Sequence, residues 1–165
     1  MKVLTVILSL CLCTGIMQAQ ETNSRSFIKQ YSGKEGYTVV TVNRTAIKLA
    51  SLLTRMQGAP KEELTFLSGI EEVQVLSLSW HKDRTNALEK AFLTFCETDG
   101  YDSILESEES GEIVRIYCSF NDRAINGFII WSREAGNVNV VFLNGCFTFE
   151  DMKVVMDKKG GNLRF

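Results

Sequence analysis

The chain has 165 residues, with 18 lysine and arginine residues against 20 acidic residues, and its formal net charge is −2. This balance excludes the strongly basic surface of a nucleic-acid-binding protein. A chain of this length corresponds to one domain, which can bury about 70% of its unfolded surface without disulfide staples. There is one histidine and no Cys-x-x-Cys pair, so we expect no metal site and no cofactor.

Residues 1–20 have the organisation of a secretory signal peptide. Lys2 precedes an apolar stretch from Val3 to Met17, and Ala19 stands just before a polar segment. The stretch is too short to span a membrane comfortably. We therefore expect cleavage near Ala19 or Gln20 and a mature single domain over residues 21–165.

The two early cysteines do not fit lipid attachment, which normally requires a small residue before the cysteine. Leu10 precedes Cys11 and Leu12 precedes Cys13. We expect a periplasmic or secreted protein that is soluble after cleavage, without a lipid anchor and without a transmembrane segment.

The first half of the mature chain alternates strand and helix patterns. A short amphipathic piece precedes a turn at Gly33 and Gly36. The expected elements are then a strand at about 37–42, a helix from the N-cap Asn43 to Gly58, a short helix from Pro60 to Leu67, a strand at 72–80 and a helix at 84–96. Helical spacing is shown by Ala46, Ile47, Ala50, Leu53 and Met56, and by Ala87, Leu88, Ala91, Phe92 and Phe95. The second of these stripes would cover the sheet.

The stretch from Glu112 to Asn144 predicts three consecutive antiparallel strands, because β-branched and aromatic runs alternate with the short polar clusters 121–124 and 134–137. A fourth strand, at 101–109, joins through Ser110 and Gly111, which suit a two-residue turn. The expected fold is α+β, with a mainly antiparallel sheet, a C-terminal four-stranded meander and helices packed on the apolar face.

The turn positions also predict a register. Ile116 should face Ile129 and Phe142, and Val114 should face Trp131 and Val140. Leu105 should lie beside Ile116, and Glu106 should lie opposite Arg115 on the other face.

The same register places an apolar row on the second face of the sheet, which we take as the candidate binding surface. Its residues are Ile104, Tyr117, Phe128, Ile130, Val141 and Leu143. Such a face is expected to alternate to polar residues when it meets solvent, and here it does so only in part. The row is either a partner site for an envelope protein or a second copy, or ordinary core beneath the N-terminal segment or a final helix. Thr148 and Asp151 resemble a capping box that opens this last helix, with Met152, Val155 and Met156 on it.

Three cysteines remain in the mature chain. The register puts Cys118 and Cys146 on strands separated by a third strand, and two strand spacings exceed the distance that a disulfide can bridge. We expect no bridge between them, while pairing of Cys96 stays open.

Several segments resemble a small exported bacterial family catalogued as domain of unknown function 4252, found mainly in Gram-negative anaerobes of the Bacteroides kind. They are FIKQYSGKEGYTVVTVNRTAIKLA, EEVQVLSLS and GYDSILESEESGEIVRIYC, and the most specific piece is Tyr31 to Gly36 with the strand and helix that follow. The resemblance covers nearly the whole mature chain and implies an exported α+β protein. It carries no assigned activity and transfers no catalytic residues. Members with a lipobox would be anchored, and this chain departs from that pattern.

Three function classes remain open. A non-catalytic envelope module that binds through its sheet is favoured, because catalytic pairs are missing while apolar surface is plentiful. An enzyme would need carboxylates brought together in a pocket, for instance near Asn144. A regulatory or structural partner of an envelope-sensing system is the third class.

Overall fold

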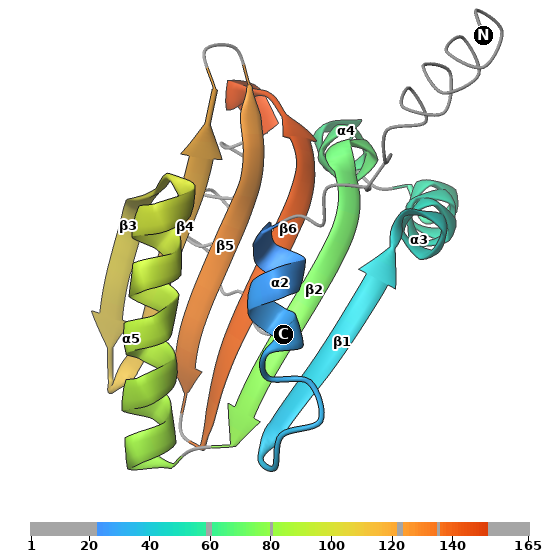
Figure 1. Ribbon diagram of the computed structural model, residues 1–165. Coiled ribbons are helices and arrows are strands. Elements are labelled where there is room, and N and C mark those ends of the chain that lie inside the picture. Colours follow the sequence, from blue (N-terminus) through green and yellow to red (C-terminus); the bar gives the residue numbers. More distant parts are fainter. Residues whose placement is uncertain (1–22, 59–60, 80, 122–123, 135, 152–165) are drawn as a thin grey trace, which may run out of the picture.

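The computed structural model describes residues 23–58, 61–79, 81–121, 124–134 and 136–151, without the side chains of residues 62 and 63. The helices are α2 (Asn23–Lys29), α3 (Arg44–Met56), α4 (Lys61–Gly69) and α5 (Lys82–Asp99). The strands are β1 (Tyr37–Asn43), β2 (Ile70–Ser79), β3 (Tyr101–Glu109), β4 (Glu112–Phe120), β5 (Ile125–Glu134) and β6 (Asn137–Phe147). All strand pairs are antiparallel, in the order β1-β2-β6-β5-β4-β3 (Figure 1). This confirms the α+β fold with a C-terminal meander, β3 to β6.

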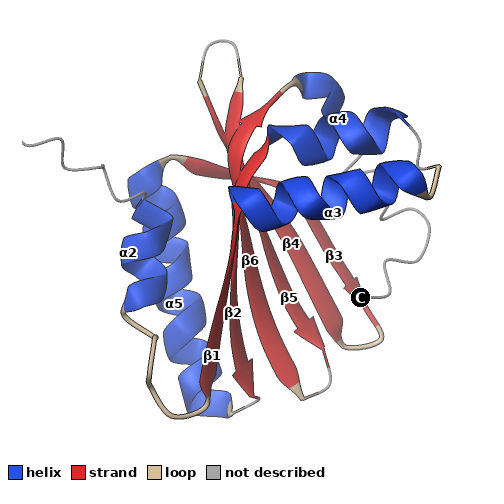
Figure 2. Cartoon of the chain, turned by 90° about the vertical axis from the view of Figure 1, so that its right-hand side faces the viewer, coloured by secondary structure: helices blue, strands red, loops and turns tan. Residues whose placement is uncertain are grey.

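Helices lie on both sides of the sheet. Helices α2 and α5 cover one side, called here the first face, while α3 and α4 lie on the opposite side, the second face (Figure 2). Each side has its own cluster of buried apolar residues. The sheet is therefore the middle layer of a three-layer arrangement, at least at the end where α3 and α4 lie.

Helix α5 provides the main cover of the first face. Leu88 and Phe92 are buried, and the ring of Phe92 stacks on Trp131 of β5 with centroids 5.0 Å apart. The helix ends at Gly100, whose φ of 69° is the left-handed conformation that glycine adopts without strain. The predicted stripe on this helix is thus confirmed at the residues that matter most for packing.

The hairpin between β3 and β4 forms as its turn residues predict. Ser110 and Gly111 both have positive φ, 53° and 86°, as a two-residue hairpin turn of this kind requires. Glu106 pairs with Arg115, and Leu105 pairs with Ile116, as expected.

The predicted register between β4 and β5 is wrong by one residue. The turn lies where the sequence puts it, since Phe120 still pairs with Ile125. Beyond it, Ser119 pairs with Gly127, so Asn126 is an additional residue in β5. This β-bulge shifts every later pair by one position.

Because of this shift, each β4 side chain beyond the bulge lies on the opposite face of the sheet from the β5 side chains that it was predicted to share a face with. Tyr117 pairs with Ile129 and Arg115 with Trp131, whereas Ile116 pairs with Ile130. Because side chains alternate along a strand, Val114 and Ile116 lie on the second face while Ile129 and Trp131 lie on the first. The β5–β6 pairs Ile129–Phe142 and Trp131–Val140 agree with the prediction.

The second-face cluster is centred on aromatic residues near the end of β6. Phe128 and Phe147 meet edge to face, with centroids 5.1 Å apart, and Phe66 of α4 stacks on Phe147 at 5.4 Å. Just beyond β6, the Thr148 backbone N–H donates to Asp151 and the Asp151 backbone N–H donates to the Thr148 hydroxyl. This reciprocal pair confirms the capping box. The helix predicted after it, with Met152, Val155 and Met156, lies outside the described residues.

Cys96 and Cys118 are buried, Cys146 is exposed, and all three are free thiols. The prediction that Cys118 and Cys146 do not pair is confirmed, and Cys96 also has no disulfide partner in the structure.

Candidate functional site

The six residues predicted to form one binding row are divided between the two faces of the sheet. Phe128 is fully buried on the second face, with Ile104 and Leu143 packed partly buried against the same cluster. Ile130 and Val141 pair with each other on that face and are half-buried. The part of the row around Phe128 is therefore core, while Ile130 and Val141 are partly exposed on the same face.

Tyr117 does not belong to that row. It lies on the first face, where it is 6% exposed and its ring meets Phe92 of α5 edge to face at 5.2 Å. Two irregularities are the cause. The bulge at Asn126 changes which β5 residues share a face with Tyr117. A register shift between Ser103 and Leu105 makes Ser103, and not Ile104 as predicted, the partner of Tyr117. Burial raises the pKa of the Tyr117 hydroxyl, with smaller opposing and reinforcing effects from charges nearby.

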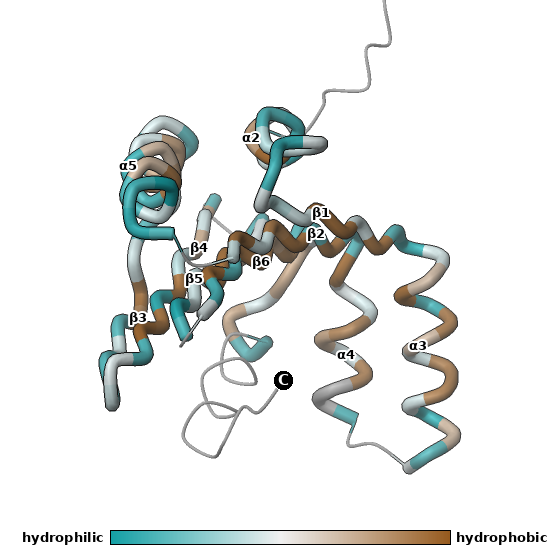
Figure 3. Tube along the Cα trace, turned by 90° about the horizontal axis from the view of Figure 1, so that it is seen from below, coloured by the Kyte–Doolittle hydropathy of each residue, from teal (hydrophilic) through white to brown (hydrophobic). Residues whose placement is uncertain are grey.

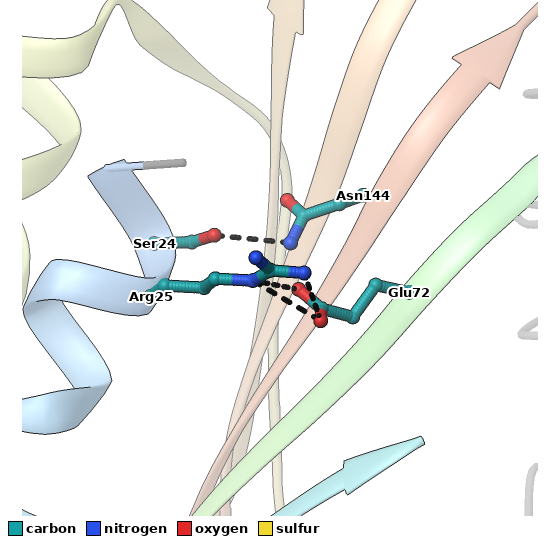
Figure 4. A network of polar contacts seen from close by, with 4 residues as sticks. All are labelled: Ser24, Arg25, Glu72 and Asn144. Atoms are coloured by element: carbon teal, nitrogen blue, oxygen red, sulfur yellow. Dashed lines mark hydrogen bonds and ion pairs between the residues drawn. The ribbon is translucent and has the colours of Figure 1, made fainter. Parts of the chain in front are cut away.

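A polar clamp holds α2 on the sheet (Figure 4). The Arg25 guanidinium donates to both oxygens of Glu72 on β2, from Nη2 at 2.7 Å and from Nε at 3.0 Å. The neighbouring side chain Asn144 of β6 donates to the Ser24 hydroxyl at 3.0 Å. Glu72 is 8% exposed, so its carboxylate needs these partners to be stable in that position. The clamp fixes the position of α2 on the sheet, and within it the Glu72 carboxylate is paired with the Arg25 guanidinium.

A second polar cluster joins α5 to the meander. Arg115 on β4 donates to Glu89 of α5 and to Glu106 of β3. Burial by itself would lower the pKa of Arg115, but the hydrogen bonds and charges of the two glutamates raise it. Arg115 is therefore a fixed cation bridging helix and sheet.

Two surface grooves lie outside these clusters. The larger, of about 620 Å³, runs between α2 and α5, and Asp99 is the only carboxylate among its described lining residues. Burial raises the pKa of Asp99, and a hydrogen bond from Asn23 opposes this. The smaller, of about 440 Å³ between α3 and α4, has no carboxylate among its described lining residues. Neither groove brings together the two carboxylates that general acid–base catalysis would use.

The remaining chemistry-bearing residues do not converge. His81 is exposed at the N-cap of α5. Within the described ranges, no three His, Cys, Asp or Glu side chains are grouped in a way that could hold a metal ion. No helix among those residues is long and apolar enough to cross a membrane.

Among the residues that the structure describes, α3 carries more exposed large apolar side chains than any other element. These side chains are Leu49 at 59%, Leu52 at 57%, Leu53 at 61% and Met56 at 84% exposed, and they are named here the α3 stripe. They follow the spacing i, i+3, i+4, i+7, so they share one side of the helix. The buried residue of α3 is Ile47, at 6% exposed. Ile47 and Leu49 differ by about 200° around the helix axis, so the centre of the stripe faces away from the side packed on the protein. Leu52, at the border of the stripe, also lines the α3–α4 groove.

The helix itself is well formed. The Asn43 side chain accepts a hydrogen bond from the Ala46 backbone N–H at 3.1 Å, as an N-cap does. At the other end, the N–H groups of Gln57 and Gly58 bond back to the last turn, and Gly58 has a φ of 76°. The stripe is therefore carried by a capped helix of defined orientation.

Figure 3 shows how α3 is presented. Helices α3 and α4 stand side by side and extend away from the sheet on the side opposite α2 and α5, and α3 carries several apolar positions along its length. Helix α3 therefore protrudes from the sheet beside α4.

Sequence reasoning missed this surface because it treated the apolar residues of 44–56 as one helical stripe without deciding which of them the fold would bury. Two signals were present. Leu49, Leu52, Leu53 and Met56 by themselves fit the helical repeat, and the segment has three basic residues and no acidic one. A basic amphipathic helix of this kind is typical of a docking surface.

Residues 31–155 match the family described as Domain of unknown function (DUF4252). No curated protein and no solved structure matches the chain.

Proposed function

The chain belongs to the DUF4252 family, and we propose that it is an exported, non-catalytic interaction module of the cell envelope that docks through the α3 stripe. The observation that carries the proposal is the outward orientation of four large apolar side chains, each more than half exposed, on a capped helix. Isolated exposed leucines are common, but these four side chains form one contiguous apolar patch, and the largest such patch on a protein is often its interaction site.

The proposed docking surface is on α3, the helix that follows β1, and not on the sheet as the sequence predicted. The predicted row is centred on Phe128, which is fully buried, so its middle is not accessible to a partner. The α3 stripe has the accessibility that the row lacks, and it lies on the same side of the sheet.

Export is supported by the signal-peptide pattern of residues 1–20. We expect the mature chain to begin within a few residues of Glu21 and to carry no lipid. Intact-mass measurement with N-terminal sequencing checks this. An acylated Cys11 or Cys13, or a retained Met1, would contradict it.

The enzyme alternative is less well supported by the geometry. Glu72, the carboxylate beside Asn144, is bound by Arg25, and the part of the α2–α5 groove that the structure describes contains Asp99 as its one carboxylate. A regulatory role in an envelope-sensing system is compatible with an interaction module, and the identity of the partner would distinguish them.

Co-fractionation with the cell envelope tests the proposal. The full-length gene product is compared with a variant carrying Leu49→Asp and Leu53→Asp, in the cell that naturally produces the chain. We expect the native protein to remain with the envelope fraction and the variant to appear in the soluble exported fraction.

The matched control is Leu93→Asp, since Leu93 is a leucine on α5 that is 40% exposed on the other side of the sheet. It should fractionate like the native chain. Equal distribution of the α3 variant and the native chain would exclude the stripe as the docking surface.

A further inference from the structure

The charges on α3 restrict what can bind the stripe. The helix contains Arg44, Lys48 and Arg55 and no acidic residue, although the chain as a whole has a net charge of −2. At about 100° per residue, these three cations fall in a narrow arc along one border of the stripe. All three are exposed, and Arg44 makes a contact of 3.5 Å with Glu71, which is also exposed. The complementary surface is therefore anionic.

A second copy of the chain fits this surface poorly. Antiparallel pairing of two stripes about a two-fold axis would bring the cations of both helices to the same side of the interface, and like charges at an interface are unfavourable. Four side chains also present only a few hundred Å². A stable protein interface buries roughly 800 Å² on each partner.

An anionic bilayer surface matches each property of the helix. Aliphatic side chains can enter the boundary between headgroups and acyl chains, and neighbouring lysine and arginine side chains extend back to the headgroups. Helix α3 has 13 residues, which corresponds to about 20 Å of helix lying along the surface. The α3–α4 pair protrudes from the sheet, so the side of α3 that bears the stripe can lie against a plane (Figure 3).

We propose that α3 binds the surface of an anionic lipid bilayer, with the α3 stripe inserted among the acyl chains and Lys48 and Arg55 at the headgroups. This inference rests on the proposed function and names the partner of the same surface. The protein would lie on the membrane by means of a folded helix, and no covalent lipid is required.

Co-sedimentation with lipid vesicles tests the inference. The probe is vesicles of phosphatidylcholine with about 30% phosphatidylglycerol, compared with phosphatidylcholine alone. We expect the purified native protein to bind the anionic vesicles, to bind neutral vesicles more weakly, and to be released from anionic vesicles as salt rises toward about 1 M.

Two matched pairs of variants assign the binding to α3. Leu49→Asp with Leu53→Asp should lower the partition coefficient about tenfold or more, whereas Leu93→Asp should leave it unchanged. Lys48→Gln with Arg55→Gln should weaken binding to anionic vesicles only, and Lys82→Gln with Lys90→Gln on α5 should have no such effect. Any binding contributed by residues 1–20 would be equal in all variants, so the differences report on α3.

Two outcomes would overturn the inference, and further readouts then show what occupies the stripe instead. Native protein that does not bind anionic vesicles contradicts it, as does binding that the α3 variants leave unchanged. If the native protein does not bind vesicles, but the α3 variant is still lost from the envelope fraction, the partner is a protein. The proposed function then stands without this inference. If light scattering shows a native dimer that the α3 variant loses while vesicles do not bind, the occupant is a second copy. Failure of both vesicle binding and α3-dependent fractionation removes the proposed function as well.

Discussion

Ile47 and Leu49 lie two residues apart on α3, yet Ile47 is 6% exposed and Leu49 is 59% exposed. One apolar side of the helix is therefore buried against the protein, and another is exposed to solvent. Ile47 contributes to the second-face cluster with Ile70 and Phe147, while Leu49 lies with the α3 stripe.

Alanine substitution should separate these two roles. Ile47→Ala removes buried methyl groups and should lower the free energy of unfolding by about 2–4 kcal/mol. Leu49→Ala removes exposed ones and should change it by about 0.5 kcal/mol or less. Urea unfolding followed by circular dichroism measures both. Similar losses for the two variants would mean that the stripe is covered in the folded protein.

The aromatic residues of the predicted row should behave as core. Phe128 is fully buried against Phe147, and Tyr117 is buried against Phe92 on the other face. Phe128→Ala should cost about 3–5 kcal/mol of stability, and Tyr117→Ala a comparable amount. Denaturant midpoints check this, with Phe120→Ala as a control, because Phe120 is 39% exposed. If the Phe128 and Tyr117 variants are as stable as the native chain, these residues are not core, and the predicted row is again a candidate binding surface.

Most of the secondary structure could be predicted because periodicity and turn chemistry are local properties. Ser110 and Gly111 alone determine a hairpin, and Asn43 caps a helix through its own side chain. The bulge at Asn126 was missed because an inserted residue leaves the apolar pattern of the strand unchanged on either side. Gly127 was the available signal, since glycine inside a strand often marks a bulge. A Cβ at that position would meet the Leu143 carbonyl oxygen and the Tyr101 hydroxyl, each at 3.1 Å.

The candidate site was harder to predict for a physical reason. A sequence shows that a face is apolar, but which of two apolar faces is covered depends on how the elements pack. In α3, the fold buries Ile47 and exposes Leu53 and Met56, although all three share one helical pattern. In the sheet, two register shifts decide that Tyr117 lies under α5.

The three cysteines among the described residues should differ in reactivity. Cys146 is exposed, whereas Cys96 is 3% exposed and Cys118 is fully buried. Burial raises the pKa of the Cys96 thiol to about 12, with smaller effects from Asp99 and Glu97, and burial together with Asp102 raises that of Cys118 to about 11. A thiol reagent at neutral pH should therefore modify one cysteine rapidly in the folded chain and all three in denaturant. Rapid reaction of Cys96 or Cys118 would contradict the packing of α5 and of the second face.

Stability should fall at alkaline pH. Burial, followed by charges nearby, raises the pKa of Tyr101 to about 12, as burial does for Cys96. A group whose pKa is higher in the folded state stabilises the fold below its unfolded pKa, which is about 8.5 for cysteine and 10 for tyrosine. That contribution is lost as the pH rises from these values toward 12. The urea midpoint should decline over this range, and the decline should be shallower in Cys96→Ala. A profile in Cys96→Ala identical to that of the native chain would exclude this thiol as a cause.

Hydrogen–deuterium exchange in the presence of anionic vesicles tests most directly whether α3 docks on an anionic membrane surface. The account predicts slower exchange of backbone amides in residues 44–56 when phosphatidylcholine–phosphatidylglycerol vesicles are added, with peptides of α5 and the β3–β4 hairpin unchanged. Unchanged exchange in residues 44–56, or protection that appears on α5 instead, would contradict it.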